Sequence, residues 1–191
     1  MELYLIRHTT PDIGAGVCYG QSDIDVAASF PVEAQTIWQK LAAIKQGVIY
    51  TSPACRCLKL AKLLAERWQC SAPVEDIRLK ELHFGEWEMQ RWDDISLQAL
   101  ERWGASYIHE SPPGGESFMV LQQRAKDFLR DLQAMPTASA VVVTHAGVIR
   151  ALVSDVMQLP LNETFDLKLG YGGITHLSFN KGAVRLVQLN G

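Results

Sequence analysis

The chain has 191 residues, of which 48% are hydrophobic and 20% charged, as is ordinary for a globular protein. Its formal net charge of -3 excludes a basic footprint for nucleic acid, so any cationic site is expected to be local. No apolar run reaches the roughly 18 residues of a membrane span, and the N-terminus lacks the basic stretch of a secretory signal. We expect one cytoplasmic domain over residues 1–191, without nucleic-acid partner or membrane span; the sequence predicts no particular oligomeric state.

The first elements read from the chain are a strand, a long loop and a helix. Residues 3–7 form an apolar run typical of a buried parallel strand. Residues 9–30 contain three glycines and a proline and predict a loop, and loops of this length are often functional. Apolar spacing predicts a helix over residues 32–44, with Pro31 in its first turn and Gly47 as its C-terminal cap.

A second strand and helix follow, and then a third strand. Residues 47–52 predict a short strand. Ser52 and Pro53 suit the N-cap and first position of a helix with an apolar stripe that continues to Trp68. Residues 74–79 predict the third strand.

Helical patterns dominate the second half. Helical periodicity returns over residues 93–103 and is broken by Pro-Pro-Gly-Gly at 112–115. The clearest helix is predicted over 116–134, followed by a strand over 140–144 and a helix over 147–157.

The chain ends in two alternating segments, 174–179 and 183–189, joined by Asn-Lys-Gly, which predicts a terminal hairpin. Strands that alternate with helices predict an α/β fold. We expect a three-layer α/β/α sandwich with a largely parallel central sheet. The four cysteines form no C-x-x-C pair, and we expect free thiols in a reducing compartment.

Two histidines mark the ends of two predicted strands. His8 follows the first strand together with Arg7, and His145 follows the strand over 140–144. Ligands bind outside the carboxyl ends of the strands in open α/β sheets, so these side chains are expected at one edge. A neutral imidazole can attack phosphorus, and the guanidinium fork fits phosphate oxygens. A structural histidine is the alternative, but a buried unpaired arginine beside it would be costly.

Further phosphate contacts are predicted at helix N-termini. Arg56 lies in the first turn of its predicted helix, where anions bind and a structural cation is disfavoured; a solvated surface arginine is the alternative. Ala146 and Gly147 follow His145 and form a small-residue turn that lets backbone N–H groups approach an oxyanion. Phosphoryl transfer depends mainly on such positioning and charge stabilisation.

A general acid is needed for the leaving group, and three glutamates are candidates: Glu81, Glu86 and Glu88. Glu81, flanked by Leu79 and Leu82, is expected to be desolvated and protonated near neutral pH. Spacing alone does not choose among the three. A metal site on His8, His83 and His145 is the rival hypothesis, but the adjacent arginines would repel a divalent cation, so we expect neither metal nor other cofactor.

These motifs resemble the histidine phosphatase (phosphoglycerate mutase-like) superfamily. The resemblance rests on segments 5–9, 52–57, 81–88, 113–117 and 143–147. It implies a phosphoglycerate mutase-like fold with His8 as the phosphorylated nucleophile and Glu81 as the acid and base. It also implies a phosphate pocket formed by Arg7, Arg56 and His145.

Within the superfamily the chain is most similar to the alpha-ribazole phosphatases of cobalamin biosynthesis. Arg-His-Thr replaces the Arg-His-Gly-Glu of mutases, residues 18–23 match a Tyr-Gly-x-x-Asp pattern, and the chain lacks the insertions of mutases. The implied reaction removes the 5′-phosphate of alpha-ribazole 5′-phosphate or adenosylcobalamin 5′-phosphate. Trp87, Trp92 and Tyr107 are candidates to stack on the benzimidazole.

Three departures from the family pattern concern substrate preference, because none removes a catalytic group. Met89 stands where glycine is usual, Leu60 where threonine is common, and His83 where Asp or Asn is frequent. Two alternatives stay open: a phosphoglycerate mutase or broad-specificity sugar-phosphate phosphatase, and a non-catalytic phosphate-binding module.

Overall fold

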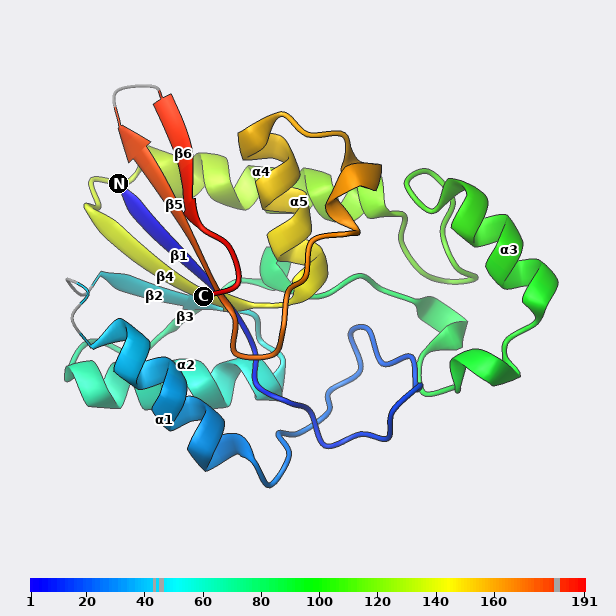
Figure 1. Cartoon of the computed structure of the whole chain (residues 1–191), viewed down its shortest axis with the longest axis horizontal. Coiled ribbons are helices and arrows are strands. Elements are labelled where there is room, and N and C mark those ends of the chain that lie inside the picture. The colour runs from blue at the N-terminus through cyan, green and yellow to red at the C-terminus, as the bar shows by residue number, and fades with distance from the viewer. Residues whose placement is uncertain (43, 45–46, 181–182) are drawn as a thin grey trace.

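The computed structural model describes residues 1–42, 44, 47–180 and 183–191, which form a mixed six-stranded sheet with helices on both faces (Figure 1). The strands are β1 (Glu2–Arg7), β2 (Val48–Thr51), β3 (Val74–Glu75), β4 (Ser139–Thr144), β5 (Ile174–Asn180) and β6 (Ala183–Gln188). The α-helices are α1 (Phe30–Leu41), α2 (Cys55–Trp68), α3 (Leu97–Ser106), α4 (Phe118–Ala134) and α5 (Ala146–Met157). The predicted α/β fold is confirmed.

The strand order is β3-β2-β4-β1-β5-β6. β1 pairs with β4, β4 with β2 and β2 with β3, all in parallel, while β5 runs antiparallel to β1 and to β6. The sheet is therefore largely parallel, as predicted, and the terminal hairpin is confirmed; the turn residues 181–182 lie outside the described part of the chain. Arg7 pairs with Thr144 in register, so β1 and β4 end at the same edge.

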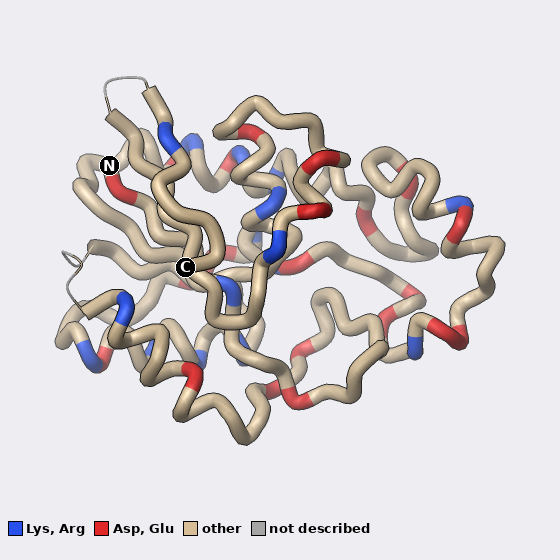
Figure 2. The backbone as a smooth tube through the Cα atoms, in the orientation of Figure 1, with Lys and Arg blue, Asp and Glu red and all other residues tan. Residues whose placement is uncertain are grey.

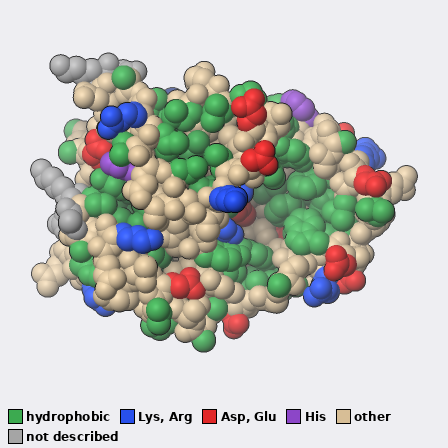
Figure 3. Space-filling view, viewed as in Figure 1, with side chains coloured by type: hydrophobic (Ala, Val, Ile, Leu, Met, Phe, Trp, Pro, Cys, Tyr) green, Lys and Arg blue, Asp and Glu red, His purple; other side chains and the backbone are tan. Residues whose placement is uncertain are grey.

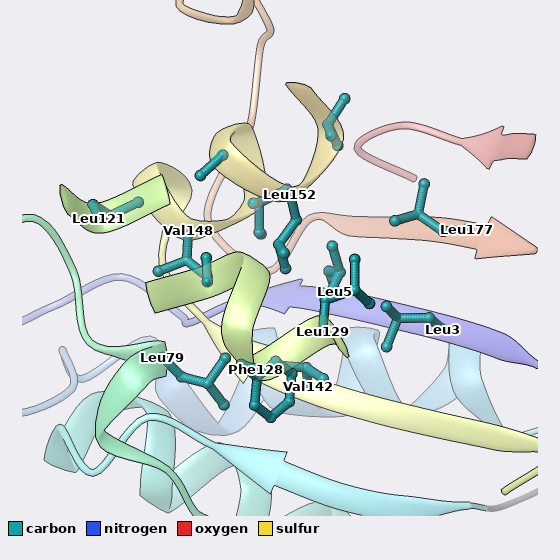
Figure 4. Packing of buried hydrophobic residues seen from close by; sticks show 14 of the residues in the cluster. Leu3, Leu5, Leu79, Leu121, Phe128, Leu129, Val142, Val148, Leu152 and Leu177 are labelled. Carbon is teal, nitrogen blue, oxygen red and sulfur yellow. The ribbon is translucent and has the colours of Figure 1, made fainter. Parts of the chain in front are cut away.

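Each face of the sheet buries its own hydrophobic cluster, because successive strand residues point to opposite faces. Leu3, Leu5 and Val142 pack beneath α4 and α5 (Figure 4). Ile6 and Val143 belong to the second cluster, which α1 and α2 cover. β4 is buried along its whole length. The two layers hold the strand ends, and so the side chains that follow them, in fixed positions.

The strand predicted over residues 74–79 is wrong beyond its second residue. β3 ends at Glu75, and Ile77–Leu79 form a 3-10 turn. The carboxylate of Asp76 accepts a hydrogen bond from the N–H of Arg78 at 2.9 Å, which closes the turn. This local capping outweighs the strand propensity of the segment.

The predicted start of α2 at Ser52 is also wrong, because α2 begins at Cys55 with Ala54 as N-cap. The N–H of Ser52 donates to the carbonyl of Val143 at 3.0 Å, so Ser52 continues the pairing of β2 with β4. Its hydroxyl contacts a histidine of the site described below. Arg56 still lies in the first turn of the helix, as predicted.

The boundaries of α1 and α3 differ from those expected. α1 ends at Leu41, and Gly47 is not its cap: a Cβ atom on Gly47 would lie 1.9 Å from the carbonyl oxygen of Ser139, so close backbone approach to β4 explains this glycine. α3 begins at Leu97 rather than near residue 93, because the chain is extended at Ile95. Burial of Ile95 beside Trp87 outweighs the helical pattern there.

Acidic and basic residues are interspersed along most of the chain (Figure 2). Residues 81–110 are an exception, since they contain seven Asp or Glu residues and two Arg. No described helix is both long and apolar enough to span a membrane. The four cysteines are free, as predicted, and Cys18 and Cys57 are buried. Met89 has a left-handed φ of 66°, which explains why glycine suits this position.

Candidate active site

The structure brings His8 and His145 together at the carboxyl edge of the sheet. Each follows directly on a strand, β1 or β4, and both side chains are buried. Their ring centroids are 5.1 Å apart and their planes are inclined by 65°. The parallel register of the two strands produces this meeting, because it carries both residues past the same sheet edge.

The tautomer of His8 is fixed by the backbone. Its Nδ1 lies 2.7 Å from the carbonyl oxygen of Thr9, and a carbonyl can only accept, so Nδ1 carries the proton and Nε2 keeps a free lone pair. Burial, together with the charges of Arg56 and Arg7, lowers the pKa of His8 to about 3, although the hydrogen bond to Thr9 opposes the shift. His8 is therefore a neutral nucleophile across the physiological pH range.

Arg56 is fully buried in the first turn of α2. Its Nη1 donates to the carbonyl of Ser22 at 2.8 Å and its Nη2 to the carbonyl of Gly20 at 2.7 Å. Its Nε atom is buried and has no hydrogen-bond partner in the described structure. The loop at 9–30 thus fixes the guanidinium through neutral carbonyls and leaves its charge for an anion.

Arg7 completes the cationic part of the site. It donates from Nη1 to the carbonyl of Leu169 and lies over the ring of Tyr171, with 3.9 Å from Cζ to the ring centroid. Its Nε atom is also buried without a described partner. Among the described residues, no acidic side chain lies within ion-pair distance of Arg7 or Arg56. Two unpaired guanidinium groups beside a neutral imidazole suit a doubly charged phosphate.

His145 is the N-cap of α5, and Ala146 is the first residue of that helix. The Nη2 of Arg56 lies 3.4 Å from Nδ1 of His145 and can only donate, so Nε2 carries the proton and donates to the hydroxyl of Ser52 at 2.8 Å. Burial, together with the charges of Arg56 and the other nearby arginines, holds the pKa of His145 well below its usual value. The N-terminus of α5 offers free N–H groups at this point, that of Ala146 among them.

Glu81 reaches the same helix N-terminus. Its two carboxylate oxygens lie 3.1 and 3.2 Å from the N–H of Gly147, and one also accepts from the N–H of Leu82 at 3.0 Å. A Cβ atom on Gly147 would lie 2.2 Å from Oε1 of Glu81, so this close approach requires glycine. Glu81 is half-buried rather than enclosed. Its hydrogen-bond partner Gly147 lies two residues after His145 in the chain.

The other two candidate glutamates have different surroundings. Glu86 is exposed. The carboxylate of Glu88 accepts from the N–H groups of Gln21 at 2.9 Å and Ser22 at 2.7 Å, and also from that of Phe84. Glu88 therefore holds the stretch of loop whose carbonyls bind the buried arginine of α2. Of the three, only Glu81 has its carboxylate at the N-terminus of α5.

Three side chains of the site were not identified from the sequence. The sequence predicts a helix cap at Ser52, whereas in the structure its hydroxyl contacts His145. Tyr19 lies over Arg56, 5.1 Å from Cζ to the ring centroid; its place in the Tyr-Gly pattern was the available signal. Tyr171 had only its flanking glycines as a signal.

Among the described residues, the aromatic side chains proposed to stack on a substrate make their ring contacts with other aromatic residues and not with the two histidines. Trp87 is buried in a third hydrophobic cluster with Cys18 and Ile95. Tyr107 lies 4.4 Å from the ring of Phe165, centroid to centroid. The molecule is hollowed on the face of Figure 3, with charged side chains in the hollow and hydrophobic side chains on one wall.

Comparison with known proteins gives this geometry a context. A probable phosphoglycerate mutase GpmB of Serratia proteamaculans is 30% identical over 168 residues, which cover 84% of this chain and 76% of that protein. A metal-independent phosphoserine phosphatase of Arabidopsis thaliana is 30% identical over 164 residues, covering 82% and 69%. The adenosylcobalamin/alpha-ribazole phosphatase of Escherichia coli is 27% identical over 197 residues, covering 100% and 96%.

The fold is shared with solved structures. The crystal structure of the alpha-ribazole phosphatase from Shigella flexneri superimposes with a TM-score of 0.91 at 23% identity, covering 100% of this chain and 96% of that chain. This likeness confirms the phosphoglycerate mutase-like fold. Residues 3–191 match the histidine phosphatase superfamily (branch 1). Since that match spans nearly the whole sequence, the chain belongs to the histidine phosphatase superfamily, whose members are phosphatases or mutases.

Proposed function

We propose that this protein is a phosphomonoesterase that acts through a phosphohistidine on His8. One observation carries the proposal: a neutral imidazole with its Nε2 lone pair free is buried beside Arg7 and Arg56, which have no acidic partner among the described residues. Such a group can attack phosphorus while the two guanidinium groups stabilise the charge on the phosphoryl oxygens. His145 would join them by turning its Nε2 proton from the hydroxyl of Ser52 to a phosphoryl oxygen.

The proposed reaction has two steps. In the first, Nε2 of His8 forms a bond to phosphorus, the ester P–O bond breaks, and Glu81 gives a proton to the leaving alkoxide. In the second, water attacks the phosphohistidine, the P–N bond breaks, and Glu81 takes a proton from the water. Inorganic phosphate leaves, and both residues return to their starting states.

The proposed substrate is alpha-ribazole 5′-phosphate, or the corresponding adenosylcobalamin 5′-phosphate. The proposal is supported by similarity to the Escherichia coli adenosylcobalamin/alpha-ribazole phosphatase along the whole chain and by the Tyr-Gly-x-x-Asp pattern in residues 18–23. The site would release a ribosyl alcohol that carries a benzimidazole.

The test is phosphate release from alpha-ribazole 5′-phosphate in EDTA, with kcat/KM compared with that for an aryl phosphate. We expect a strong preference for the ribazole ester, no requirement for a divalent metal, and inhibition by vanadate, which mimics the transferring phosphoryl group. Equal turnover of the two esters would reject the specific substrate. Loss of activity in EDTA that magnesium restores would reject the metal-independent mechanism.

The phosphohistidine itself is tested by trapping. After brief mixing with substrate, the wild-type protein should carry acid-labile phosphate and His8→Ala should carry none. Wild-type turnover by His8→Ala would rule out this mechanism. Absence of both turnover and labelled protein across a panel of phosphate esters would favour a non-catalytic binding module.

A second candidate function is phosphoglycerate mutase activity. It is favoured by the 30% identity to the probable mutase of Serratia proteamaculans. A mutase must keep its phosphoenzyme until a second acceptor arrives, whereas a hydrolase admits water first. Net isomerisation of 3-phosphoglycerate without phosphate release would reverse the order of the two candidates.

A further inference from the structure

Tyr19 and Tyr171 meet at the site although they are 152 positions apart in the sequence. Tyr19 belongs to the loop at 9–30, and Tyr171 lies in the segment that leads from α5 to β5. Their hydroxyl oxygens are 3.2 Å apart, within hydrogen-bond distance. The contact therefore ties together two segments that approach the strand ends from different parts of the chain.

Each ring of this tyrosine pair also lies on one of the two arginines. The Cζ atom of Arg7 is 3.9 Å from the ring centroid of Tyr171, and that of Arg56 is 5.1 Å from the ring centroid of Tyr19. Both distances fall within the range of cation–π attraction. Since neither arginine has an acidic partner among the described residues, the rings, a few carbonyl oxygens and Nδ1 of His145 are what orient the guanidinium groups.

The tyrosine pair also lies close to the nucleophile. The ring of Tyr171 is 5.5 Å from that of His8, centroid to centroid, while 41% of the Tyr171 surface is exposed. Tyr171 is thus a partly exposed neighbour of the buried imidazole. Desolvation by burial and, next to it, the hydrogen bond to Tyr171 raise the pKa of Tyr19. Its hydroxyl therefore keeps its proton at physiological pH, and the contact between the two tyrosines persists.

We propose that Tyr19 and Tyr171 act together as positioning residues, which hold the guanidinium groups of Arg7 and Arg56 at the spacing that receives a phosphate group. This rests on the proposed function, because it takes the two arginines as the phosphate ligands. The hydrogen bond between the hydroxyls couples the two rings. Removing either hydroxyl breaks this one bond, so the two removals should have the same effect on phosphate binding.

The experiment measures the affinity for inorganic phosphate by isothermal titration calorimetry in Tyr19→Phe, Tyr171→Phe and the double variant. Removing one neutral hydrogen bond should weaken binding about 3-fold. The double variant should be weakened by the same factor as each single variant, because all three lack the same bond. Tyr4→Phe is the matched control: its ring stacks on His176 away from the site, and phosphate affinity should not change.

Removing a ring should have a larger effect than removing a hydroxyl. Tyr171→Leu loses the cation–π contact as well, and we expect phosphate affinity to fall about 10-fold. In turnover of an aryl phosphate, KM should rise in the phenylalanine variants more than kcat falls. A general structural defect would instead lower the melting temperature and the active fraction without this split.

Two results would overturn the proposal: unchanged phosphate affinity in both single variants, or single effects that multiply in the double variant. Phosphate binding does not require turnover, so the two proposals fail separately. Coupled losses of phosphate affinity in a protein that hydrolyses no ester would reject the phosphatase and keep the positioning role. Ester hydrolysis together with unchanged phosphate affinity in all variants would keep the phosphatase and reject the positioning role.

Discussion

The side chains of the site owe their chemistry to what surrounds each of them. His8 is neutral because it is buried beside two cationic groups, and its free nitrogen is Nε2 because Nδ1 donates to a backbone carbonyl. His145 is neutral for the same reasons and donates to Ser52. Glu81 and Glu88 are both acidic residues of one short segment, yet one meets a helix N-terminus and the other anchors a loop.

The buried histidines predict how stability depends on pH. The pKa of His8 is lowered to about 3 in the folded protein, against an ordinary value of 6.5 for histidine. Between these values the unfolded chain binds a proton that the folded protein does not, so the free energy of unfolding falls as pH falls from 6.5 toward 3. One such histidine contributes a slope of about 1.4 kcal/mol per pH unit.

This slope is measured by urea unfolding of the wild type and of His8→Asn at several pH values from 7 to 4. Below pH 6, the free energy of unfolding should depend on pH less steeply in the variant than in the wild type, by about 1.4 kcal/mol per pH unit. Other titrating groups are common to both proteins and cancel in the difference. Parallel curves for the two proteins would contradict a depressed pKa of His8.

At the scale of elements, short turns at the ends of strands and helices decide where the reactive groups lie. β1 and β4 carry His8 and His145 past one sheet edge, and the N-terminus of α5 meets Glu81. The 3-10 turn at Ile77–Leu79 redirects the chain after β3, just before Glu81. Local capping at Asp76 thus has a consequence for the site.

The contact between α5 and Glu81 predicts a strong effect of Gly147→Ala. The added Cβ would lie 2.2 Å from Oε1 of Glu81, so the carboxylate must move. Misplacing a catalytic group by about 1 Å can cost about 100-fold in rate. We expect kcat for the preferred ester to fall by that order, measured in EDTA at saturating substrate.

The matched control is Gly104→Ala. Gly104 lies in α3, and a Cβ there would have no atom within 4 Å. This variant should keep wild-type turnover and gain up to about 1 kcal/mol of stability from helix propensity. Equal activity of the two alanine variants would show that Glu81 does not need its present position.

At the scale of the molecule, three hydrophobic clusters surround the site. Two lie on opposite faces of the sheet, and the third joins the loop at 9–30 to the segment before α3 through Cys18, Trp87 and Ile95. The loop, which carries Tyr19 and the carbonyls that hold Arg56, is therefore anchored on a cluster away from the sheet.

A single folding unit over residues 1–191 stays a prediction, and unfolding tests it. Trp87 belongs to the third cluster, whereas far-UV circular dichroism is dominated by the sheet and its helices. One cooperative unit requires coincident transitions by tryptophan fluorescence and circular dichroism. Trp92 and Trp103 pack on the same cluster, whereas Trp38 and Trp68 pack on the cluster under α1 and α2. Fluorescence changes that precede the loss of secondary structure, and that persist when Trp38 and Trp68 are replaced by Phe, would show that the third cluster unfolds separately.

The sequence by itself determined the α/β architecture, the parallel strands and the meeting of His8 with His145. These follow from local patterns: apolar runs form central strands, and parallel strands end at one edge. The residue types that follow them, a histidine beside an arginine, already indicated a phosphate site. Inaccurate predictions of the strands and helices themselves were confined to boundaries, where a capping side chain such as Asp76 or a buried residue such as Ile95 outweighed periodicity.

Only the tertiary structure decided which supporting side chains reach the site. Spacing alone did not distinguish Glu81 from Glu86 and Glu88, since the backbone N–H of Gly147, 66 positions later, makes the difference. The roles of Ser52, Tyr19 and Tyr171 were equally hidden. These side chains come from turns and loops, whose paths depend on packing between distant segments and leave no periodic pattern in the sequence.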